Sequence, residues 1–374
     1  MITRAGPRIF VSAGEPSGDL HGAGVVRALR ERYPNASIEA LGGPWMAQAG
    51  ATLRYNMEGL AAFGFVEIVS KLGAHLRLLR ALRQDLRAGR YDLVILIDYP
   101  GFHLRVAEAA RTAGTKVLYY IAPQLWAWRP ERARRLAAAV DRLAVVLPFE
   151  QPFFSGLGLR SEYVGHPLVD RAPAPSRAAA RESLRIPPGS KVLGLFPGSR
   201  AQEIRRLWAP FRDAAERLRA EGRCDRVLVA GTEWGQYPEP GSAEIVRSDP
   251  ARLLAASDAA LVKSGTTTLE AALSGTPMVV AYKVHPLTYQ LAQRVRTVEW
   301  VSLVNLVAGS EVVPELLQDR AEAESLAEAL RPLLDPDDPR TRAQQEGFAL
   351  VRRRLGEPGA TTRVVALAEE LLGA

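Results

Sequence analysis

The chain has 374 residues, of which 47% are apolar, enough to bury the cores of two domains of ordinary size. Its single cysteine excludes an internal disulfide and a cysteine-based zinc cluster. The net charge of +7 suits an anionic partner such as nucleic acid, a phosphorylated substrate or an anionic lipid, but the alternative is a GC-rich genome that encodes basic residues as arginine. A nucleic-acid partner is disfavoured because no RNA-recognition, helix-turn-helix or zinc-finger pattern is present.

In the first half of the chain, short apolar runs alternate with longer segments of helical period. These runs are rich in Val, Ile and Leu and do not alternate with polar residues, which is typical of parallel strands buried on both faces. Helices are predicted between them, for example at Gly18–Arg32 and Leu104–Ala113. The predicted strands are Arg8–Ala13, Ile38–Leu41, Leu93–Asp98, Val117–Ile121 and Leu143–Leu147.

The loop after the first predicted strand is rich in glycine and acidic residues. It lies within Ile9–Gly24, and its glycines do not have the G-x-G-x-x-G spacing of a dinucleotide site. Its acidic side chains suit the recognition of sugar hydroxyls better than that of phosphate. The alternative is a set of turn glycines with an aspartate at a helix start. The candidate ligand residues are Gly14, Glu15, Ser17, Gly18 and Asp19.

A basic amphipathic segment, Phe65–Arg90, precedes the next strand. Such a segment can lie on an anionic bilayer, but it can equally pack on a sheet with its arginines in solvent. A later stretch, Leu118–Arg135, has tryptophans among arginines, which is typical of a membrane interface or of an aromatic cluster at a domain crevice. The candidate lipid-contacting residues are Phe65, Val66, Ile68, Val69, Leu72, Leu76, Trp126 and Trp128.

Asp98 ends the apolar run Leu93–Asp98. A carboxylate at the carboxyl end of a buried strand faces the ligand crevice of an open α/β sheet, where partial burial raises its pKa towards that of a general base. The alternative is an aspartate that caps the next helix.

A break follows at His166–Pro167 and Arg171–Ser176, and the strand–helix alternation then restarts. We predict an α/β fold with two Rossmann-like, doubly wound domains, 1–168 and 169–355. The last helix, about 356–374, can pack back on the first domain. The strands predicted for the second domain are Val192–Phe196, Arg226–Ala230, Ala259–Val262 and Met278–Tyr282.

Two strand–loop–helix junctions of the second predicted domain indicate an anion site. Small residues at a helix start let phosphate approach, and the free N–H groups there donate hydrogen bonds to it. Arg200 lies at the start of such a helix, where a cation is unfavourable unless an anion lies beside it. No Walker loop is present. The alternative for the later junction is a Ser/Thr cap with Glu270 as its capping-box partner. The candidate residues are Gly198, Ser199, Arg200, Ser264, Gly265, Thr266, Thr267 and Glu270.

No run approaches the 18 apolar residues of a membrane-spanning helix, and the N-terminal apolar run is too short for a secretory signal. The expected location is therefore the cytosol.

Taken together, ten segments resemble the lipid-A-disaccharide synthase family, glycosyltransferases of the GT-B fold. They occur in order over roughly the first 310 residues. The segments are SAGEPSGDLHGA, GGPWMAQAG, FGFVEIV, LIDYPGFHLRVA, APQLWAWRPERARRL, LPFE, VGHPLVD, LFPGSRAQEI, KSGTTTLEAALSGTPMVVAYKVHPLT and EWVSLVNLVAG.

The resemblance implies an inverting transfer between two acylated sugars. UDP-2,3-diacylglucosamine would react with 2,3-diacylglucosamine 1-phosphate (lipid X), giving UDP and the β-1′,6-linked disaccharide. The family needs no metal or other cofactor for this step, acts at the cytoplasmic face of the inner membrane and can form homodimers. Its two domains face each other across a cleft, the second holding the nucleotide and the first the acceptor.

The resemblance also assigns roles to residues. Asp98 matches the base that deprotonates the acceptor 6-hydroxyl, Arg200 the arginine suited to the diphosphate, and Glu270 the ribose partner. Ser264, Gly265 and Thr266 match the phosphate loop, and Asn305 matches an asparagine of the family's S-L-x-N-L motif. Two alternatives stay open: a UDP-N-acetylglucosamine 2-epimerase-like enzyme of the same fold, and a non-catalytic nucleotide-sugar sensor.

Overall fold

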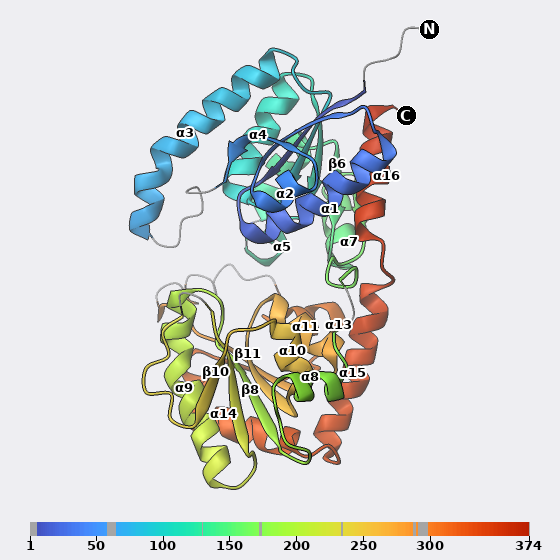
Figure 1. Cartoon of the computed structure of the whole chain (residues 1–374). Coiled ribbons are helices and arrows are strands. Elements are labelled where there is room, and N and C mark those ends of the chain that lie inside the picture. The colour runs from blue at the N-terminus through green and yellow to red at the C-terminus, as the bar shows by residue number, and fades with distance from the viewer. Residues whose placement is uncertain are drawn as a thin grey trace. The chain divides into compact units, whose positions relative to one another are not determined.

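The computed structural model describes residues 6–57, 65–128, 130–171, 174–232, 235–286, 289–290 and 298–373, and only the backbone of 65–72, 128, 130 and 131. The chain divides into two compact units (Figure 1). Unit 1 comprises Met1–Arg171 together with Gly356–Ala374, and unit 2 comprises Ala172–Leu355.

Unit 1 is built on a seven-stranded parallel sheet of order β3-β2-β1-β4-β5-β6-β7. The central strand β4 is buried along its whole length, as its uninterrupted apolar sequence LVILI predicts. β1 runs beside β4 with Ala13 opposite Ile97. The strands are β1 (Arg8–Ala13), β2 (Ser37–Gly42), β3 (Thr52–Asn56), β4 (Leu93–Ile97), β5 (Lys116–Tyr120), β6 (Arg142–Val145) and β7 (Ser161–Tyr163).

Helices cover both faces of this sheet. α1 packs against α2 and α16, whereas α4 packs against α3 and α6. The helices are α1 (Pro16–Arg32), α2 (Pro44–Gln48), α3 (Phe65–Arg87), α4 (Pro100–Thr112), α5 (Leu125–Trp128), α6 (Pro130–Ala139), α7 (Glu150–Ser155) and α16 (Ala360–Leu372).

Unit 2 is built on a six-stranded parallel sheet of order β10-β9-β8-β11-β12-β13. Its strands are β8 (Val192–Phe196), β9 (Arg226–Ala230), β10 (Ala243–Val246), β11 (Ala259–Lys263), β12 (Met278–Tyr282) and β13 (Glu315–Leu317). Its helices are α8 (Arg177–Ser183), α9 (Ala201–Ala220), α10 (Pro250–Ala256), α11 (Thr266–Ser274), α13 (Leu303–Ala308), α14 (Ala323–Leu330) and α15 (Pro339–Leu355), with 3₁₀ turns at Gln318–Arg320 and Arg331–Leu334. The predicted fold of two doubly wound parallel sheets is confirmed.

The core of unit 2 lies between its sheet and helices α9 and α14. In α9 the buried side chains recur at helical spacing, as at Ile204, Leu207, Trp208 and Phe211. Each fully buried side chain of this size contributes about 1.5–3 kcal/mol by leaving water. This burial fixes the start of α9, and therefore the loop that precedes it, against the sheet.

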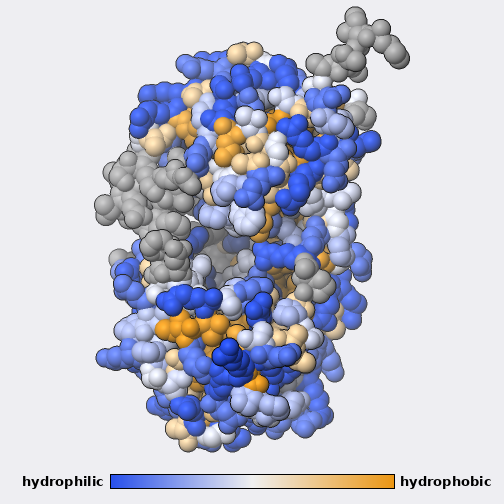
Figure 2. Space-filling model, in the orientation of Figure 1, coloured by the Kyte–Doolittle hydropathy of each residue, from blue (hydrophilic) through white to orange (hydrophobic). Residues whose placement is uncertain are grey.

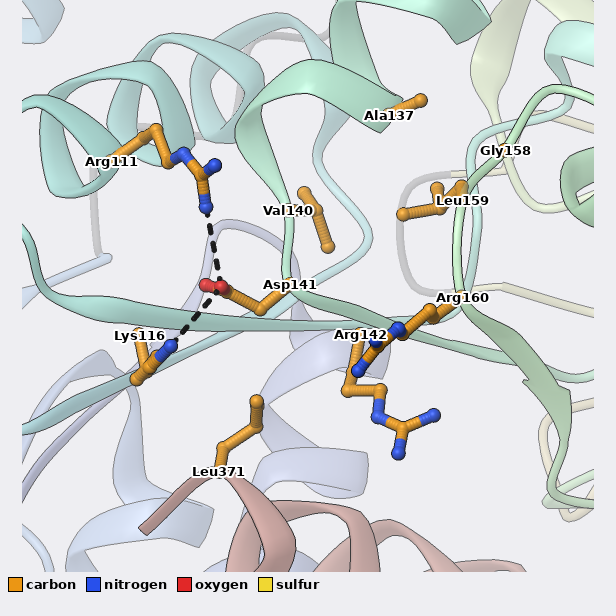
Figure 3. A pocket seen from close by; sticks show the side chains of 10 residues that line it. All are labelled: Arg111, Lys116, Ala137, Val140, Asp141, Arg142, Gly158, Leu159, Arg160 and Leu371. Carbon is orange, nitrogen blue, oxygen red and sulfur yellow. Dashed lines mark hydrogen bonds and ion pairs between the residues drawn. The ribbon is translucent and has the colours of Figure 1, made fainter. Parts of the chain in front are cut away.

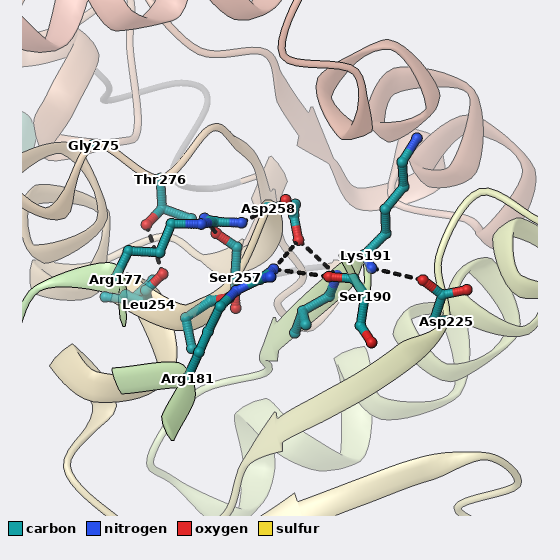
Figure 4. Close-up of polar contacts among 12 residues, drawn as sticks. Arg177, Arg181, Ser190, Lys191, Asp225, Leu254, Ser257, Asp258, Gly275 and Thr276 are labelled. Atoms are coloured by element: carbon teal, nitrogen blue, oxygen red, sulfur yellow. Dashed lines mark hydrogen bonds and ion pairs between the residues drawn. The ribbon is translucent and has the colours of Figure 1, made fainter. Parts of the chain in front are cut away.

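A carboxylate joins α8 to the sheet of unit 2. Asp258, which directly precedes β11, accepts hydrogen bonds from Arg177 (2.5 Å) and Arg181 (2.7 Å), which Figure 4 shows beside it. It also accepts from the Val192 N–H (2.7 Å). The same carboxylate therefore pairs with two guanidinium groups and accepts the hydrogen bond of an N–H group at the start of β8.

The last helix, α16, returns to unit 1 and is held there by its first turn. The Asp170 carboxylate accepts hydrogen bonds from the N–H groups of Gly359 (2.7 Å), Ala360 (3.2 Å) and Thr361 (3.2 Å). Arg363 donates to the Val164 carbonyl at 2.7 Å. A carboxylate here satisfies N–H groups that lack partners within the helix and interacts favourably with its dipole.

We predict that Asp170→Ala loosens α16 by about 1–2 kcal/mol, because three N–H groups lose their acceptor. Amide hydrogen exchange should accelerate across α16 while the amides of β8 and β11 in unit 2 stay as protected as in the wild type. Asp337→Ala is the matched control and should leave α16 unchanged, because it removes an exposed carboxylate that forms an ion pair with Arg342. Equal exchange in both variants would disprove the anchoring role of Asp170.

Candidate functional site

Each sheet has a point where the strand order reverses. In unit 1 it lies between β1 and β4, and in unit 2 between β8 and β11. The loops after such a pair of strands diverge and leave a crevice beyond the carboxyl ends, which is where open α/β sheets bind ligands. The predicted site residues Gly14–Asp19 and Asp98 follow β1 and β4, and Gly198–Arg200 and Ser264–Thr267 follow β8 and β11.

In unit 1 the loops after β1 and β4 touch through Gly14 and Tyr99. A Cβ at Gly14 would lie 2.3 Å from the Tyr99 ring, so a larger residue would displace that ring. Tyr99 also makes a hydrogen bond with His75 of α3 (2.5 Å). Asp98 and Glu15 are half-buried in these two loops. The structure thus brings Asp98 and the first predicted loop to one edge of the sheet.

Asp19 has a different role from the predicted contact with substrate. Its side chain is fully buried, and its carboxylate accepts hydrogen bonds from the N–H groups of Gly43 (2.8 Å), Trp45 (3.0 Å) and Met46 (3.2 Å) at the start of α2. These hydrogen bonds hold α2 against α1, and the Asp19 carboxylate does not face solvent. Ser17, in contrast, is exposed.

Trp126 was predicted to contact lipid, and the structure corrects this. Its side chain is buried, stacks edge-on against Phe149 and donates a hydrogen bond from Nε1 to Glu150 (2.9 Å). The Glu150 carboxyl also accepts from the N–H groups of Val146 (3.3 Å) and Leu147 (3.1 Å). Burial raises the pKa of Glu150 to about 7, with a smaller contribution from the negative charge of Asp98.

Of the other residues predicted to contact lipid, the structure describes the side chain of Leu76 alone. The side chains of Phe65, Val66, Ile68, Val69, Leu72 and Trp128 lie outside the described residues. Leu76 is exposed, but Leu79, Leu82 and Leu86 are buried, so the second half of α3 packs on its unit with its arginines outward. Figure 2 shows that the drawn face of the molecule is mostly hydrophilic. No described helix is long and apolar enough to cross a bilayer.

In unit 2 the loop after β8 is organised by Glu203. Gly198 has a left-handed backbone (φ 114°), and a Cβ there would lie 2.5 Å from the Glu203 carboxylate. That carboxylate accepts from the Arg200 N–H (3.3 Å) and pairs with Lys263 (2.9 Å) at the end of β11. The Arg200 side chain remains 61% exposed, with its guanidinium 3.9 Å from Glu203. Two cations therefore meet at the switch point, and Lys263 is one that the sequence analysis did not select.

The second loop leads directly into α11, which begins at Thr266 as predicted. Ser264 is buried and donates a hydrogen bond to the Val301 carbonyl (2.9 Å). Glu270 is the fifth residue of α11, whereas a capping-box partner would be the third, Thr268. The capping alternative for Glu270 is therefore excluded by its position.

Asn305 also differs from its predicted role as a substrate contact. Its side chain is fully buried. Nδ2 donates to the Val313 carbonyl and to Glu315, and Oδ1 accepts from the N–H groups of Val312 and Val313. These four hydrogen bonds use the whole capacity of an amide. Glu315 in turn accepts from the N–H groups of residues 301 and 302, so Asn305 supports the segment that Ser264 contacts.

A surface cavity of about 370 Å³ lies at the opposite, amino-terminal edge of the unit 1 sheet (Figure 3). Asp141 sits at its centre and pairs with Arg111 (3.3 Å) and Lys116 (3.6 Å). The cavity is remote along β4 and β5 from Asp98 and is not the candidate site. Within the described part of the chain, no cluster of three or more His, Cys, Asp or Glu could hold a metal ion.

Comparisons with known proteins show the family to which the chain belongs. The family model described as Lipid-A-disaccharide synthetase matches residues 9–359. The chain belongs to this family. It is 40% identical to the lipid-A-disaccharide synthase of Geobacter sulfurreducens, over 100% of this chain and 99% of that protein. The family predicted from the ten sequence segments is thereby confirmed, as is its role in lipid A disaccharide synthesis.

Solved structures confirm the GT-B fold predicted for this lipid-A-disaccharide synthase family member. The glycotransferase of kitacinnamycin has a TM-score of 0.65 at 19% identity and covers 98% of this chain and 99% of its own. A putative UDP-N-acetylglucosamine 2-epimerase from Listeria monocytogenes has a TM-score of 0.67 at 11% identity and covers 97% and 96%. At such low identity the epimerase shares only the fold, so the alternative of an epimerase is not supported.

We predict that Glu150→Gln changes how stability depends on pH. A carboxyl with a pKa raised from 4.5 to about 7 keeps its proton in the folded chain where the unfolded chain has lost it. Folding stability therefore falls as pH rises from about 5 to 8, by at most about 3 kcal/mol. Denaturant midpoints of the variant should lack this component. If the midpoints of wild type and variant run parallel between pH 5 and pH 8, Glu150 does not titrate in this range.

Proposed function

We propose that the chain transfers 2,3-diacylglucosamine from its UDP derivative to the 6-hydroxyl of lipid X with inversion, releasing UDP. The observation that carries this proposal is the meeting of Arg200, Lys263 and the start of α11 at the switch point of unit 2. Membership of the lipid-A-disaccharide synthase family supports the identity of the two acylated sugars.

The second unit is suited to a departing diphosphate. An inverting transfer develops negative charge on the leaving UDP, which fixed donors and cations stabilise. Arg200 presents an exposed guanidinium that can hold two phosphate oxygens, and the free N–H groups of Thr266 and Thr267 begin α11. Glu270, one turn further along α11, is assigned to the ribose hydroxyls.

The first unit supplies the base. Asp98 follows β4 at the switch point and is half-buried, so its carboxylate is partly withdrawn from water. In the proposed reaction it takes the proton of the acceptor hydroxyl as that oxygen attacks the anomeric carbon. Glu15 and Ser17 in the neighbouring loop are assigned to the sugar hydroxyls of the acceptor.

The decisive experiment measures UDP release by the purified full chain with each sugar alone and with both. We expect release only when UDP-diacylglucosamine and lipid X are both present. Arg200→Ala should lower the rate by more than about a hundredfold, since charge stabilisation of a leaving group contributes on this scale.

Arg205→Ala is the matched control, because Arg205 is an exposed arginine one turn further along the same helix. It should retain the wild-type rate, and both variants should keep the wild-type melting temperature. Turnover of UDP-N-acetylglucosamine alone would overturn the proposed reaction, and a mild effect of Arg200→Ala would remove Arg200 from the diphosphate.

We further propose that the enzyme acts in the cytoplasm, attached peripherally to the inner membrane, where its acylated substrates reside. The exposed arginines of α3, Arg77, Arg80 and Arg83, and the exposed Leu76 support contact with an anionic surface. Family resemblance also leads us to propose a homodimer, which sedimentation of the pure protein at micromolar concentration tests.

Replacing Arg77, Arg80 and Arg83 by Gln should weaken binding to phosphatidylglycerol vesicles about a hundredfold, because each basic residue near such a surface contributes about 1 kcal/mol. Co-sedimentation at low salt measures this. The control replaces three exposed arginines of unit 2, Arg205, Arg219 and Arg223. Equal losses in the two triple variants would contradict a membrane-facing role for α3.

A further inference from the structure

The turn after β4 has an unusual backbone at two consecutive residues. Asp98 (φ 50°) and Tyr99 (φ 53°) both adopt the left-handed conformation, although neither is glycine. A β-carbon makes this conformation unfavourable, and such residues persist only where the surroundings hold them. The strain falls on the residue assigned as the base and on its neighbour.

Two buried side chains hold the Asp98 carbonyl. Tyr119 of β5 donates its hydroxyl proton to this oxygen (2.7 Å), and Nδ1 of His103 in α4 lies 2.6 Å from it. The Asp98 N–H donates to the Tyr120 carbonyl (3.0 Å), and the Tyr99 carbonyl accepts from the His103 N–H (3.0 Å). The peptide that links Asp98 to Tyr99 is therefore restrained from both sides.

The hydrogen bonds also define the state of His103. A carbonyl oxygen only accepts, so Nδ1 must carry a proton. Burial lowers the pKa of His103 to about 4, so the ring is neutral and Nε2 is an acceptor. Ser12 of β1 lies 2.8 Å from Nε2 and must donate to it. Ser12, His103 and Tyr119 are all fully buried, and they come from the three elements around β4.

We propose that Ser12, His103 and Tyr119 form a positioning clamp that holds Asp98 in its left-handed conformation and so sets the direction of its carboxylate. Tyr119 and His103 contact the Asp98 carbonyl oxygen directly and Ser12 contacts it through His103, among strands whose buried side chains are mostly apolar. Apolar residues of similar shape would pack there without needing any partner. The inference rests on the proposed function, in which Asp98 is the base.

The clamp predicts a loss of turnover without a loss of substrate affinity. Tyr119→Phe removes one hydroxyl and should lower kcat about tenfold while KM stays within about twofold, because positioning acts on the reacting state. Tyr120→Phe is the matched control: Tyr120 is the next residue of β5 and is also buried, and its hydroxyl makes no hydrogen bond to the described residues. It should retain the wild-type kcat.

A second pair of variants separates positioning from packing. In His103→Asn the side-chain amide can still donate near the position of Nδ1, whereas His103→Leu cannot donate. We expect His103→Asn to keep most of the wild-type kcat and His103→Leu to lose about tenfold or more at equal melting temperature. If His103→Leu fails to fold, Tyr119→Phe alone carries the test.

Asp98→Asn distinguishes the clamp from the function on which it rests. Adding Tyr119→Phe to Asp98→Asn should cost no further activity, because the clamp acts through the Asp98 carboxylate. A wild-type kcat for Asp98→Asn would overturn the assigned base. If Asp98→Asn is slow but Tyr119→Phe has the wild-type kcat, the clamp is overturned and the assigned base is not. The same holds if Tyr119→Phe lowers kcat by the same factor in the wild type and in Asp98→Asn.

Discussion

The position of the functional loops depends on one topological constraint, the reversal of strand order within each parallel sheet. β1 and β4 in unit 1, and β8 and β11 in unit 2, are neighbours whose following helices leave in opposite directions. Right-handed crossovers require this divergence, and backbone groups at the two strand ends consequently face a crevice instead of a helix. The strand order therefore determines where each unit can bind a ligand, and the side chains of the loops determine which ligand it can bind.

Several carboxyl side chains of this protein accept hydrogen bonds from backbone N–H groups and so hold the start of a helix or a loop segment. Asp19 holds the start of α2, Asp170 the start of α16, Glu150 the segment after β6, and Glu315 the segment before α13. Burial protects hydrogen bonds of this kind from competition with water, and an ionised carboxylate makes them stronger than a protonated carboxyl, the state that Glu150 holds below about pH 7. At Asp98 the buried side chains of Tyr119 and His103 hold the backbone carbonyl. In the proposed function Asp98 therefore acts as the base from a turn whose backbone is held in place.

The sequence predicted the buried strands well and the contacts of polar residues poorly. Central strands such as β4 and β8 are uninterrupted apolar runs, whereas the edge strands β3 and β10 are partly exposed and mix polar with apolar residues. Motif spacing placed the loops at the correct strand ends. It could not show that backbone N–H groups hold Asp19, or that backbone groups and Glu315 use the whole hydrogen-bonding capacity of Asn305. Those partners, among them Gly43 and Val313, become neighbours only through folding. The hydrogen bond of Tyr119 to the Asp98 carbonyl was not predicted for the same reason, since an aromatic residue within an apolar strand is typical of the core.

In the anion site proposed for unit 2, the Glu203 carboxylate lies between two cationic side chains. Arg200 and Lys263 would repel each other at a shared position without an intervening carboxylate, and Glu203 contacts both. The contacts are unequal: Lys263 is held at 2.9 Å and is mostly buried, whereas the Arg200 guanidinium is 3.9 Å away and exposed. A dianionic diphosphate would therefore find Arg200 free to reorient and Lys263 already fixed. In the proposed function, the arginine would therefore capture the ligand and the lysine would set the local electrostatic potential.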